Sequence, residues 1–527
     1  MQSSKTVWMR LRLSGWSKLM IVVVDFGSQY SHLITKRFRE LGEYTELIDP
    51  KALQKYLTYP ETKGIVLSGG PRSVYEKSAP QLSSDVLKSL KPILGICYGY
   101  HLVAKLAGGT VIAGNKREYG VHEISLDTSA KIFAGLSSVE SALMSHGDEL
   151  EELPAGYSAI GWSEGEVTAF QNEKQHIYGL QFHPEVAHTP NGRRILENFL
   201  QICGASRTWQ EDLWLEDQIK KIRKKVDGKI LMAVSGGVDS TVAAAMIERA
   251  VPDKLHCVFI DNGLLRHNEA ENVRTYYSSI FRHFHFIDAS DEFLSSLDGI
   301  SDPEKKRKII GERFARILEA KAQQLENEFG HFKFLGQGTI YPDRIESAKA
   351  SKKADLIKTH HNVGGLPDDL SLELIEPLTD LYKYEVRRVG QLLDIPHWIL
   401  DRHPFPGPGL AVRLLGPIKK SALDVLREAD AILLEELQNR DLMSEFWQVF
   451  FVLLPIKAVG VMGDARTYEN VGVIRGVQSE DAMTASVPAL DMRHFIEIAN
   501  RIVNEVRGVN RVTLDLTSKP PATIEWE

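Results

Sequence analysis

Short, continuous apolar runs that alternate with amphipathic helical stretches are the feature that most constrains how this chain folds. Met20 to Val24, Gly64 to Leu67 and Ile93 to Ile96 are such runs, and a loop rich in glycine or polar residues follows each. Strands that are apolar on both faces are typical of a parallel sheet covered by helices on both sides. We therefore predict a doubly wound α/β domain that binds ligands at the carboxyl ends of its strands.

A second alternating series follows a tryptophan-containing helical linker at residues 208–226. Its predicted strands are Ile230 to Val234, Leu255 to Ile260, His285 to Asp288 and Phe332 to Leu335. The pattern changes near residue 405, where prolines alternate with glycines, and predicted helices at 423–438 and 492–506 then enclose strand-like runs at 449–454 and 459–462. This last section is typical of an α+β domain.

These patterns predict an α/β protein with two doubly wound parallel-sheet domains followed by a smaller α+β C-terminal domain. A chain of 527 residues is too long for a single core. We place the domains at 20–205, 206–404 and 405–527. Residues 1–19 form a basic extension that lacks the features of a targeting peptide, so we expect it to be non-essential, with Met20 as the alternative start.

Composition narrows the class of protein further. The net charge of −7 argues against a general nucleic-acid-binding protein, and we expect no nucleic-acid partner. No apolar run approaches the ~20 residues needed to span a bilayer, so we expect no membrane partner. The three cysteines, Cys97, Cys203 and Cys257, have neither disulfide-framework nor zinc-ligand spacing, which favours a reducing cytoplasm.

The first candidate site is the segment Gly95-Ile96-Cys97-Tyr98-Gly99, which follows a buried strand and precedes a helix. Glycines on both sides of Cys97 allow a sharp turn that presents its thiol, and a helix amino terminus favours the thiolate. Taken alone, this segment is more often a structural cysteine at a turn. Downstream, His183 and Glu185 supply a base and a group that orients it, as cysteine attack requires.

Together with the Ser68-Gly69-Gly70-Pro71 turn, these residues resemble the class I (triad) glutamine amidotransferases over roughly residues 20–203. The resemblance implies that Cys97 forms a γ-glutamyl thioester that water then hydrolyses. It also implies an oxyanion hole made by the Gly70 and Tyr98 amides. This chain carries His101 at a position where the family usually has Gln to hold the substrate glutamine.

The second candidate site is a glycine-rich loop between a predicted strand and an alanine-rich helix. It reads Ser235-Gly236-Gly237-Val238-Asp239-Ser240-Thr241. Backbone N–H groups at the glycines, three hydroxyl groups and the helix amino terminus together favour a phosphate. The alternative is an ordinary glycine turn capped by serine and aspartate. The chain has no GxxxxGK[ST] motif, so the loop is not of the Walker type.

This loop resembles that of the ATP pyrophosphatases, which cleave ATP between its α- and β-phosphates. The resemblance implies that the loop binds ATP and that Asp239 helps to hold Mg²⁺ near the pyrophosphate. Lys383 is a candidate for neutralising the leaving pyrophosphate, with a solvated surface lysine as the alternative at nearly even odds.

Several further segments resemble the glutamine-hydrolysing GMP synthetases over essentially all of residues 20–527. The segments are the basic run at 302–311, the strand end at 334–343, the glycine-hinged loop at 360–367, HPFPGPGLAVR at 403–413, VGVMGDARTYENV at 459–471 and the C-terminal SKPPATIEWE. The resemblance implies ATP, glutamine and xanthosine monophosphate (XMP) as substrates, with Arg307, Lys519, Ile524 and Glu525 contacting XMP. It also implies that the C-terminal domain completes the XMP site and pairs two subunits into a homodimer.

Two other functions compete with this one. A glutamine-dependent NAD synthetase shares the ATP loop, but it usually takes its ammonia from a Glu-Lys-Cys domain, whose order is not seen here. A catalytically silent nucleotide or glutamine sensor is the second alternative. The intact Cys97, His183 and Glu185 and the intact glycine-rich loop speak against it, and His101 is its only support.

Overall fold

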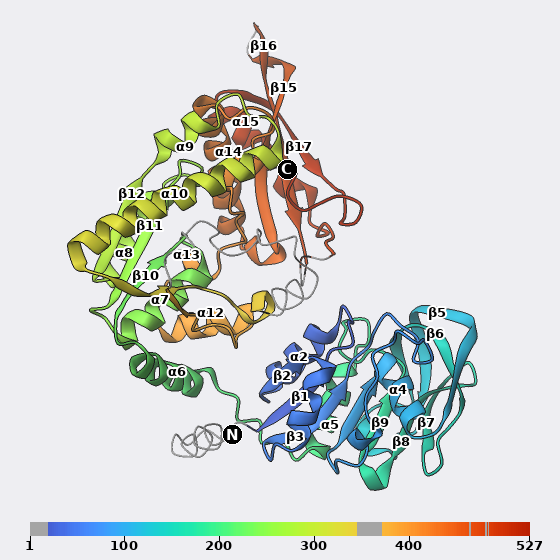
Figure 1. The fold of residues 1–527 in the computed structure, drawn as a ribbon. Helices are drawn as coiled ribbons and strands as arrows, with labels where there is room; N and C mark the ends of the chain where they lie inside the picture. Colours follow the sequence, from blue (N-terminus) through green and yellow to red (C-terminus); the bar gives the residue numbers. More distant parts are fainter. Residues whose placement is uncertain (1–18, 345–371, 463–464, 480–481, 483) are drawn as a thin grey trace. The chain divides into compact units, whose positions relative to one another are not determined.

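The computed structural model describes residues 19–344, 372–462, 465–479, 482 and 484–527. The chain divides into two compact units, residues 1–214 and 215–527, and each is described by itself (Figure 1). Two segments for which we made predictions from the sequence lie outside the described residues. They are the basic extension, apart from residue 19, and the glycine-hinged loop at 360–367.

The first unit is built on a nine-stranded sheet in the order β2-β1-β3-β4-β9-β8-β7-β5-β6. Its strands are β1 (Met20–Val24), β2 (Thr45–Ile48), β3 (Thr62–Leu67), β4 (Ile93–Ile96), β5 (Thr110–Leu126), β6 (Val139–Glu152), β7 (Ser158–Ser163), β8 (Glu166–Asn172) and β9 (Ile177–Leu180). Its helices are α2 (Ser31–Glu40), α3 (Leu53–Leu57), α4 (Tyr98–Leu106) and α5 (Gly192–Ile202).

Helices cover both faces of the parallel half of this sheet. In β3, Gly64 packs against Cys203 and Phe199 at the end of α5, whereas Leu67 packs against Gly99 of α4. Residues 64 and 67 point to opposite faces because strand side chains alternate. The predicted doubly wound arrangement is therefore confirmed for β1, β2, β3, β4 and β9, which pair in parallel.

The remaining strands, β5 to β8, were not predicted, and they extend the sheet in antiparallel pairs. The long β5 and β6 carry many charged and polar residues and are partly exposed. Because they lack a continuous apolar run, their sequence does not carry the signal of a buried parallel strand.

The second unit contains a five-stranded parallel sheet and a three-stranded mixed sheet. The strands are β10 (Lys229–Ala233), β11 (Leu255–Asp261), β12 (His283–Asp288), β13 (Phe332–Gly336) and β14 (Glu373–Ile375), followed by β15 (Gln448–Met462), β16 (Ala465–Val477) and β17 (Val509–Asp515). The helices are α7 (Val238–Ala250), α8 (Glu269–Ile280), α9 (Ser290–Ser296), α10 (Pro303–Phe329), α12 (Lys383–Leu392), α13 (His397–Leu400), α14 (Lys420–Asn439) and α15 (Met492–Glu505), and α6 (Glu211–Lys225) contains the unit boundary.

The parallel sheet has the order β12-β11-β10-β13-β14, so the chain reverses direction across the sheet between β10 and β13. Helix α8 covers one face through Tyr277 against Phe259, and α10 covers the other through Phe329 against His256. In an open α/β sheet, the carboxyl ends of strands at such a reversal form the usual ligand site. The predicted ATP loop follows β10 at this point.

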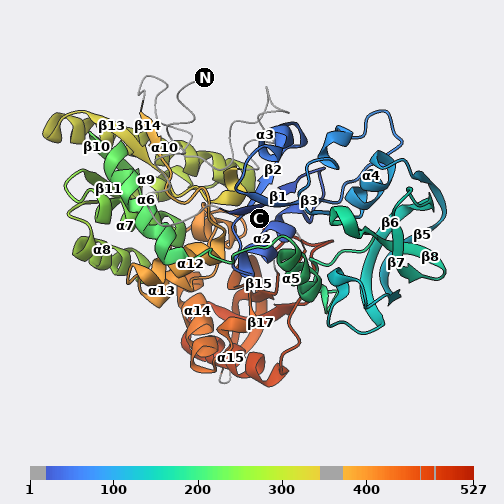
Figure 2. The same cartoon turned by 90° about the horizontal axis from the view of Figure 1, so that it is seen from below.

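Helices α14 and α15 pack against β15 and β17 of the mixed sheet (Figures 1 and 2). The two predicted strand-like runs at 449–454 and 459–462 belong to one strand, β15, whose register shifts between Leu453 and Lys457. One hydrophobic core contains residues of the parallel sheet, such as Leu231 and Val258, and residues of the C-terminal segment, such as Phe451. The domain boundary at residue 404 stays a prediction.

A stack of three histidines lies on the α10 face of the parallel sheet. The His256 ring is stacked on His283 at 4.5 Å and on His285 at 5.4 Å between centroids. Burial, together with neighbouring positive groups, lowers the pKa of His256 to about 4. The unfolded chain, with an ordinary histidine pKa near 6.5, therefore binds this proton more readily as the pH falls from about 6.5 towards 4.

We expect acidification from pH 7 to pH 5 to destabilise the second unit by about 2 kcal/mol through His256. In His256→Gln this part of the pH dependence should disappear, whatever the absolute stability of the variant. Urea unfolding of the full chain at both pH values measures the difference. The control is His331→Gln, because His331 is exposed. An equal loss in His256→Gln and in the unaltered chain would contradict the assignment.

Candidate active sites

Cys97 occupies a sharp strand-to-helix turn in the first unit. It lies between β4 and α4, with φ of +50° and ψ of −105°, a conformation that side chains other than glycine seldom adopt. A Cβ atom at Gly95 would lie 2.5 Å from the Gly99 carbonyl oxygen, and one at Gly99 would lie 2.1 Å from the Leu67 carbonyl oxygen. The glycines on either side of the cysteine are therefore required by close backbone approach.

His183 and Glu185 follow β9, the strand next to β4. Their side chains are joined by a 2.8 Å contact between His183 Nδ1 and Glu185 Oε1, and both residues are buried. This contact fixes the orientation of the imidazole and leaves Nε2 available for chemistry. Because β4 and β9 are neighbours, the residues that follow them lie at the same edge of the sheet. His183 and Glu185 are therefore at the edge that also carries Cys97.

The charge of the site favours an imidazolium at neutral pH. Burial alone lowers the pKa of His183, but the Glu185 carboxylate and the contact with Cys97 outweigh burial and raise that pKa well above its usual range. His183 is therefore placed to exchange a proton with the Cys97 thiol, as attack by a cysteine requires. The three side chains can therefore perform nucleophilic catalysis on an amide.

A cavity of about 720 Å³ opens in front of the thiol. Cys97, Tyr98, His101, His183 and Gly70 are among the residues that line it. In the described part of the chain, the backbone N–H groups of Gly70 and Tyr98 donate to no backbone carbonyl. Two free amide donors beside a nucleophile are suited to a negatively charged oxygen, which supports their assignment to an oxyanion hole.

The wall of this cavity includes residues that the sequence analysis did not single out. Ser28, Gln29 and Tyr30 follow β1, and Tyr30 makes an edge contact with the His183 ring at 5.1 Å between centroids. Asp148 accepts hydrogen bonds from Ser73 and Tyr75 on the same wall. The loop after β1 was identifiable in principle, because strand ends of a parallel sheet meet at one edge.

The glycine-rich loop of the second unit has the geometry expected of an anion site. It joins β10 to α7, and Gly236 has φ of +75°. Ser235 Oγ and Ser240 Oγ lie 3.2 Å apart, and the Gly237 N–H points to Ser235 Oγ at 3.3 Å. Thr241 is turned inward instead, with its hydroxyl on the Gly237 carbonyl and on Tyr277. The hydroxyls of Ser235 and Ser240 and the start of α7 therefore converge on one place.

Asp239, in the first turn of α7, forms an ion pair with Lys383 at the start of α12. The structure thus places Lys383 beside the loop, and its role towards pyrophosphate stays a prediction. The Oδ1 atom of Asp239 is buried and lacks a hydrogen-bond partner in the described part of the chain. A carboxylate oxygen left free beside a phosphate loop fits Mg²⁺, which commonly takes one or two carboxylates and completes its shell with phosphate and water oxygens.

The four residues predicted to contact the acceptor each have a different partner in the described part of the chain. Ile524 is buried in the core of the mixed sheet, and Glu525 forms an ion pair with Arg413 at 2.8 Å. Lys519 donates to the Ala482 carbonyl, and Arg307 pairs with Glu304 on α10. Lys306, next to Arg307, forms an ion pair with Glu527, which ties the first turn of α10 to the C-terminal segment.

Comparisons with known proteins match this chain over most of its length. The family model described as glutamine amidotransferase class-I matches residues 22–203, and the model described as GMP synthase C terminal domain matches residues 435–526. Curated relatives named "GMP synthase [glutamine-hydrolyzing]" match along the chain. That of Thermomicrobium roseum is 51% identical over 515 residues, covering 96% of each chain. Those of Aquifex aeolicus and Debaryomyces hansenii are each 47% identical, covering 96% of this chain and 99% and 97% of theirs.

Proposed function

The chain belongs to the glutamine-hydrolysing GMP synthases, and from this premise we propose how its two units divide the chemistry. The enzyme is a carbon–nitrogen ligase that makes GMP with glutamine as the nitrogen donor. The proposal assigns release of ammonia to the first unit and activation of the acceptor to the second.

In the first unit, Cys97 attacks the side-chain amide carbon of glutamine. His183 transfers a proton to the departing nitrogen, which leaves as ammonia, and a γ-glutamyl thioester remains on the sulfur. The Gly70 and Tyr98 amides stabilise the negative oxygen that forms in this step. Water, activated by His183, then cleaves the thioester to give glutamate and the free thiol. The 2.8 Å contact between His183 and Glu185 holds the base in place throughout.

In the second unit, the loop Ser235-Gly236-Gly237-Val238-Asp239-Ser240-Thr241 binds ATP. The O2 oxygen of XMP attacks the α-phosphorus, the bond to the β-phosphate oxygen breaks, and pyrophosphate leaves. Ammonia then attacks C2 of the adenylated purine and expels AMP, giving GMP. Lys383 neutralises charge on the pyrophosphate, and Mg²⁺, when held by Asp239, supplies further neutralisation of the phosphates.

Arg307, Lys519, Ile524 and Glu525 contact XMP in this proposal. The tie between Lys306 and Glu527 supports it, because it holds the start of α10 next to the C-terminal segment. Glu525 is only partly exposed, at 20%, and is oriented by the buried Arg413. A carboxylate fixed in this way is suited to recognise hydrogen-bond donors of a purine or ribose.

We further propose that the C-terminal domain, residues 405–527, pairs two chains. The hairpin of β15 and β16 extends beyond the rest of the second unit (Figure 1) and exposes several apolar side chains. They are Ile456, Val459, Val461 and Tyr468, with 53% to 74% exposure. Light scattering of the full chain should give twice the chain mass of 59.2 kDa, and a monomer would contradict the pairing.

We assign the enzyme to the reducing cytoplasm. Cys97, Cys203 and Cys257 are all free and buried, which is consistent with this assignment. In the described part of the chain, no helix has the length and apolar character needed to cross a membrane.

The observation that carries the proposal is that one chain holds a buried His183–Glu185 pair beside Cys97 and a glycine-rich loop at the start of α7 that carries Ser235, Ser240 and the Asp239–Lys383 ion pair. Its test is pyrophosphate release from ATP with different acceptors. We expect release that depends on XMP and is absent with the deamido form of NAD. Release with the dinucleotide would favour the NAD synthetase alternative, and binding without any release would favour a silent sensor.

A further inference from the structure

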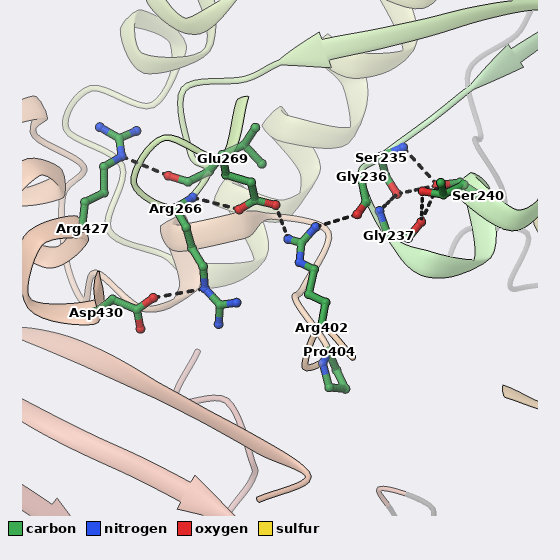
Figure 3. Close-up of polar contacts among 12 residues, drawn as sticks. Ser235, Gly236, Gly237, Ser240, Arg266, Glu269, Arg402, Pro404, Arg427 and Asp430 are labelled. Carbon is green, nitrogen blue, oxygen red and sulfur yellow. Dashed lines mark hydrogen bonds and ion pairs between the residues drawn. The ribbon is translucent and has the colours of Figure 1, made fainter. Parts of the chain in front are cut away.

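Arg402 contacts both the proposed ATP loop and the first residue of α8. Its Nη1 donates to the Gly236 carbonyl oxygen at 3.0 Å, and its Nη2 lies 2.5 Å from Glu269 Oε1 (Figure 3). The side chain is only 12% exposed. A planar guanidinium holds both acceptors at once, which an ammonium group cannot do with the same geometry.

This contact bears on how the loop meets a phosphate. In a trans peptide the C=O of one residue and the N–H of the next point in opposite directions. Because Arg402 anchors the Gly236 carbonyl on one side, the Gly237 N–H is turned to the other side, where Ser235 Oγ lies. Arg402 therefore fixes the direction of an amide that faces the predicted phosphate position, without touching that position.

Pro404, two residues after Arg402, is connected through Gln448 to Glu525. The Pro404 carbonyl accepts a hydrogen bond from Gln448 Nε2 at 3.0 Å, and this same nitrogen donates to Glu525 Oε1 at 2.7 Å. Gln448 is buried at 3% exposure, so these contacts are shielded from water. Glu525 is one of the residues assigned to XMP.

Phe405 provides a second connection between the two ends. Its ring lies 4.9 Å from the Arg402 guanidinium and 5.1 Å from that of Arg413. Arg413 in turn forms the ion pair with Glu525. Pro404 and Pro406 restrict the backbone on both sides of the ring, so the segment has few ways to absorb a displacement at one end.

We propose that residues 402–405 form a bridge that couples ATP binding to acceptor binding, with Arg402 as a positioning residue for the ATP loop. This inference rests on the proposed function, because it takes the loop as the ATP site and Glu525 as part of the XMP site. Coupling through the bridge is reciprocal: XMP should tighten ATP binding by the same factor by which ATP tightens XMP binding.

The test measures the dissociation constant of α,β-methylene ATP with Mg²⁺, with and without saturating XMP, by calorimetry on the full chain. In the unaltered enzyme we expect XMP to tighten binding by a factor of about 5 or more, as is typical of coupled sites. In Arg402→Lys we expect the factor to fall below about 2, since one ammonium group cannot replace the two-acceptor contact. Arg440→Lys is the matched control, because Arg440 also spans two acceptors, Glu436 and Glu497, but it directly follows α14 and links that helix to α15.

Gln448→Leu is a second variant, which changes the contacts at the Pro404 end of the bridge. It provides the test if Arg402→Lys fails to fold. It removes the contacts with Pro404 and Glu525 and should lower the coupling factor in the same way. A factor near 1 in the unaltered enzyme, or an unchanged factor in both variants, would overturn the proposal. An unaltered enzyme that forms GMP but shows no such coupling would refute the bridge alone, whereas absence of XMP-dependent pyrophosphate release would refute the proposed function.

Discussion

Replacing Cys97 by alanine should abolish GMP formation from glutamine while formation from ammonium salt continues. The thiol is the nucleophile of the first unit, and its removal should lower glutamine hydrolysis by at least about 10³-fold, because loss of a nucleophile removes the covalent route entirely. Adenylation of XMP uses groups of the second unit only. GMP formation with ammonium salt should therefore stay within about 3-fold of the unaltered enzyme. Assays of GMP with each nitrogen source measure both effects.

Cys203→Ala is the control for this variant. Cys203 is also a buried thiol of the first unit, but it packs against Gly64 at the end of α5 and lies outside the cavity. Both activities should survive this change. Loss of ammonium-driven GMP formation in Cys97→Ala would mean that the thiol takes part in activating the acceptor, contrary to the division of chemistry proposed above.

Replacing Asp239 by asparagine should suppress GMP formation with either nitrogen source. The change removes the charge that faces Lys383 and the free carboxylate oxygen beside the ATP loop while keeping the size of the side chain. We expect a fall of about 10²-fold or more in pyrophosphate release, because electrostatic groups that act on a phosphoryl transfer commonly contribute this much. Pyrophosphate release with XMP and ammonium salt checks it.

Asp227→Asn provides the matched comparison. Asp227 also pairs with a lysine, Lys333, at 2.9 Å, but both side chains are exposed and away from the loop. Surface pairs of this kind contribute little to stability, so the control should retain its activity. If both variants lost activity equally, a general effect on folding would explain the loss and the assignment of Asp239 would fail.

The sequence predicts the strands and turns that carry chemistry far better than the rest of the fold. β1 and β4 have the predicted bounds, and the residues around Cys97 and His183 meet at adjacent strand ends as expected. Their apolar runs and fixed glycines are local signals. The antiparallel β5 to β8 have mixed composition, so nothing in a short window distinguishes them from exposed loops.

Contacts between segments distant in the chain lie beyond what the sequence can predict. The HPFPGPGLAVR segment was identified by its resemblance to a known family, but the contact of Arg402, which directly precedes it, is with Gly236, 166 residues away. The ion pair between Asp239 and Lys383 spans 144 residues. Only the fold decides which of many arginines and lysines reaches the loop, because each is equally able to pair with solvent-exposed partners.

The most direct test of the account follows the amide nitrogen of glutamine into the product. The unaltered enzyme is incubated with ATP, Mg²⁺, XMP and glutamine labelled with ¹⁵N in its side-chain amide, and mass spectrometry measures the nucleotides. The account predicts that each GMP carries one ¹⁵N atom and that one AMP forms for each GMP. Formation of ADP in place of AMP, or an absence of labelled GMP, would contradict it.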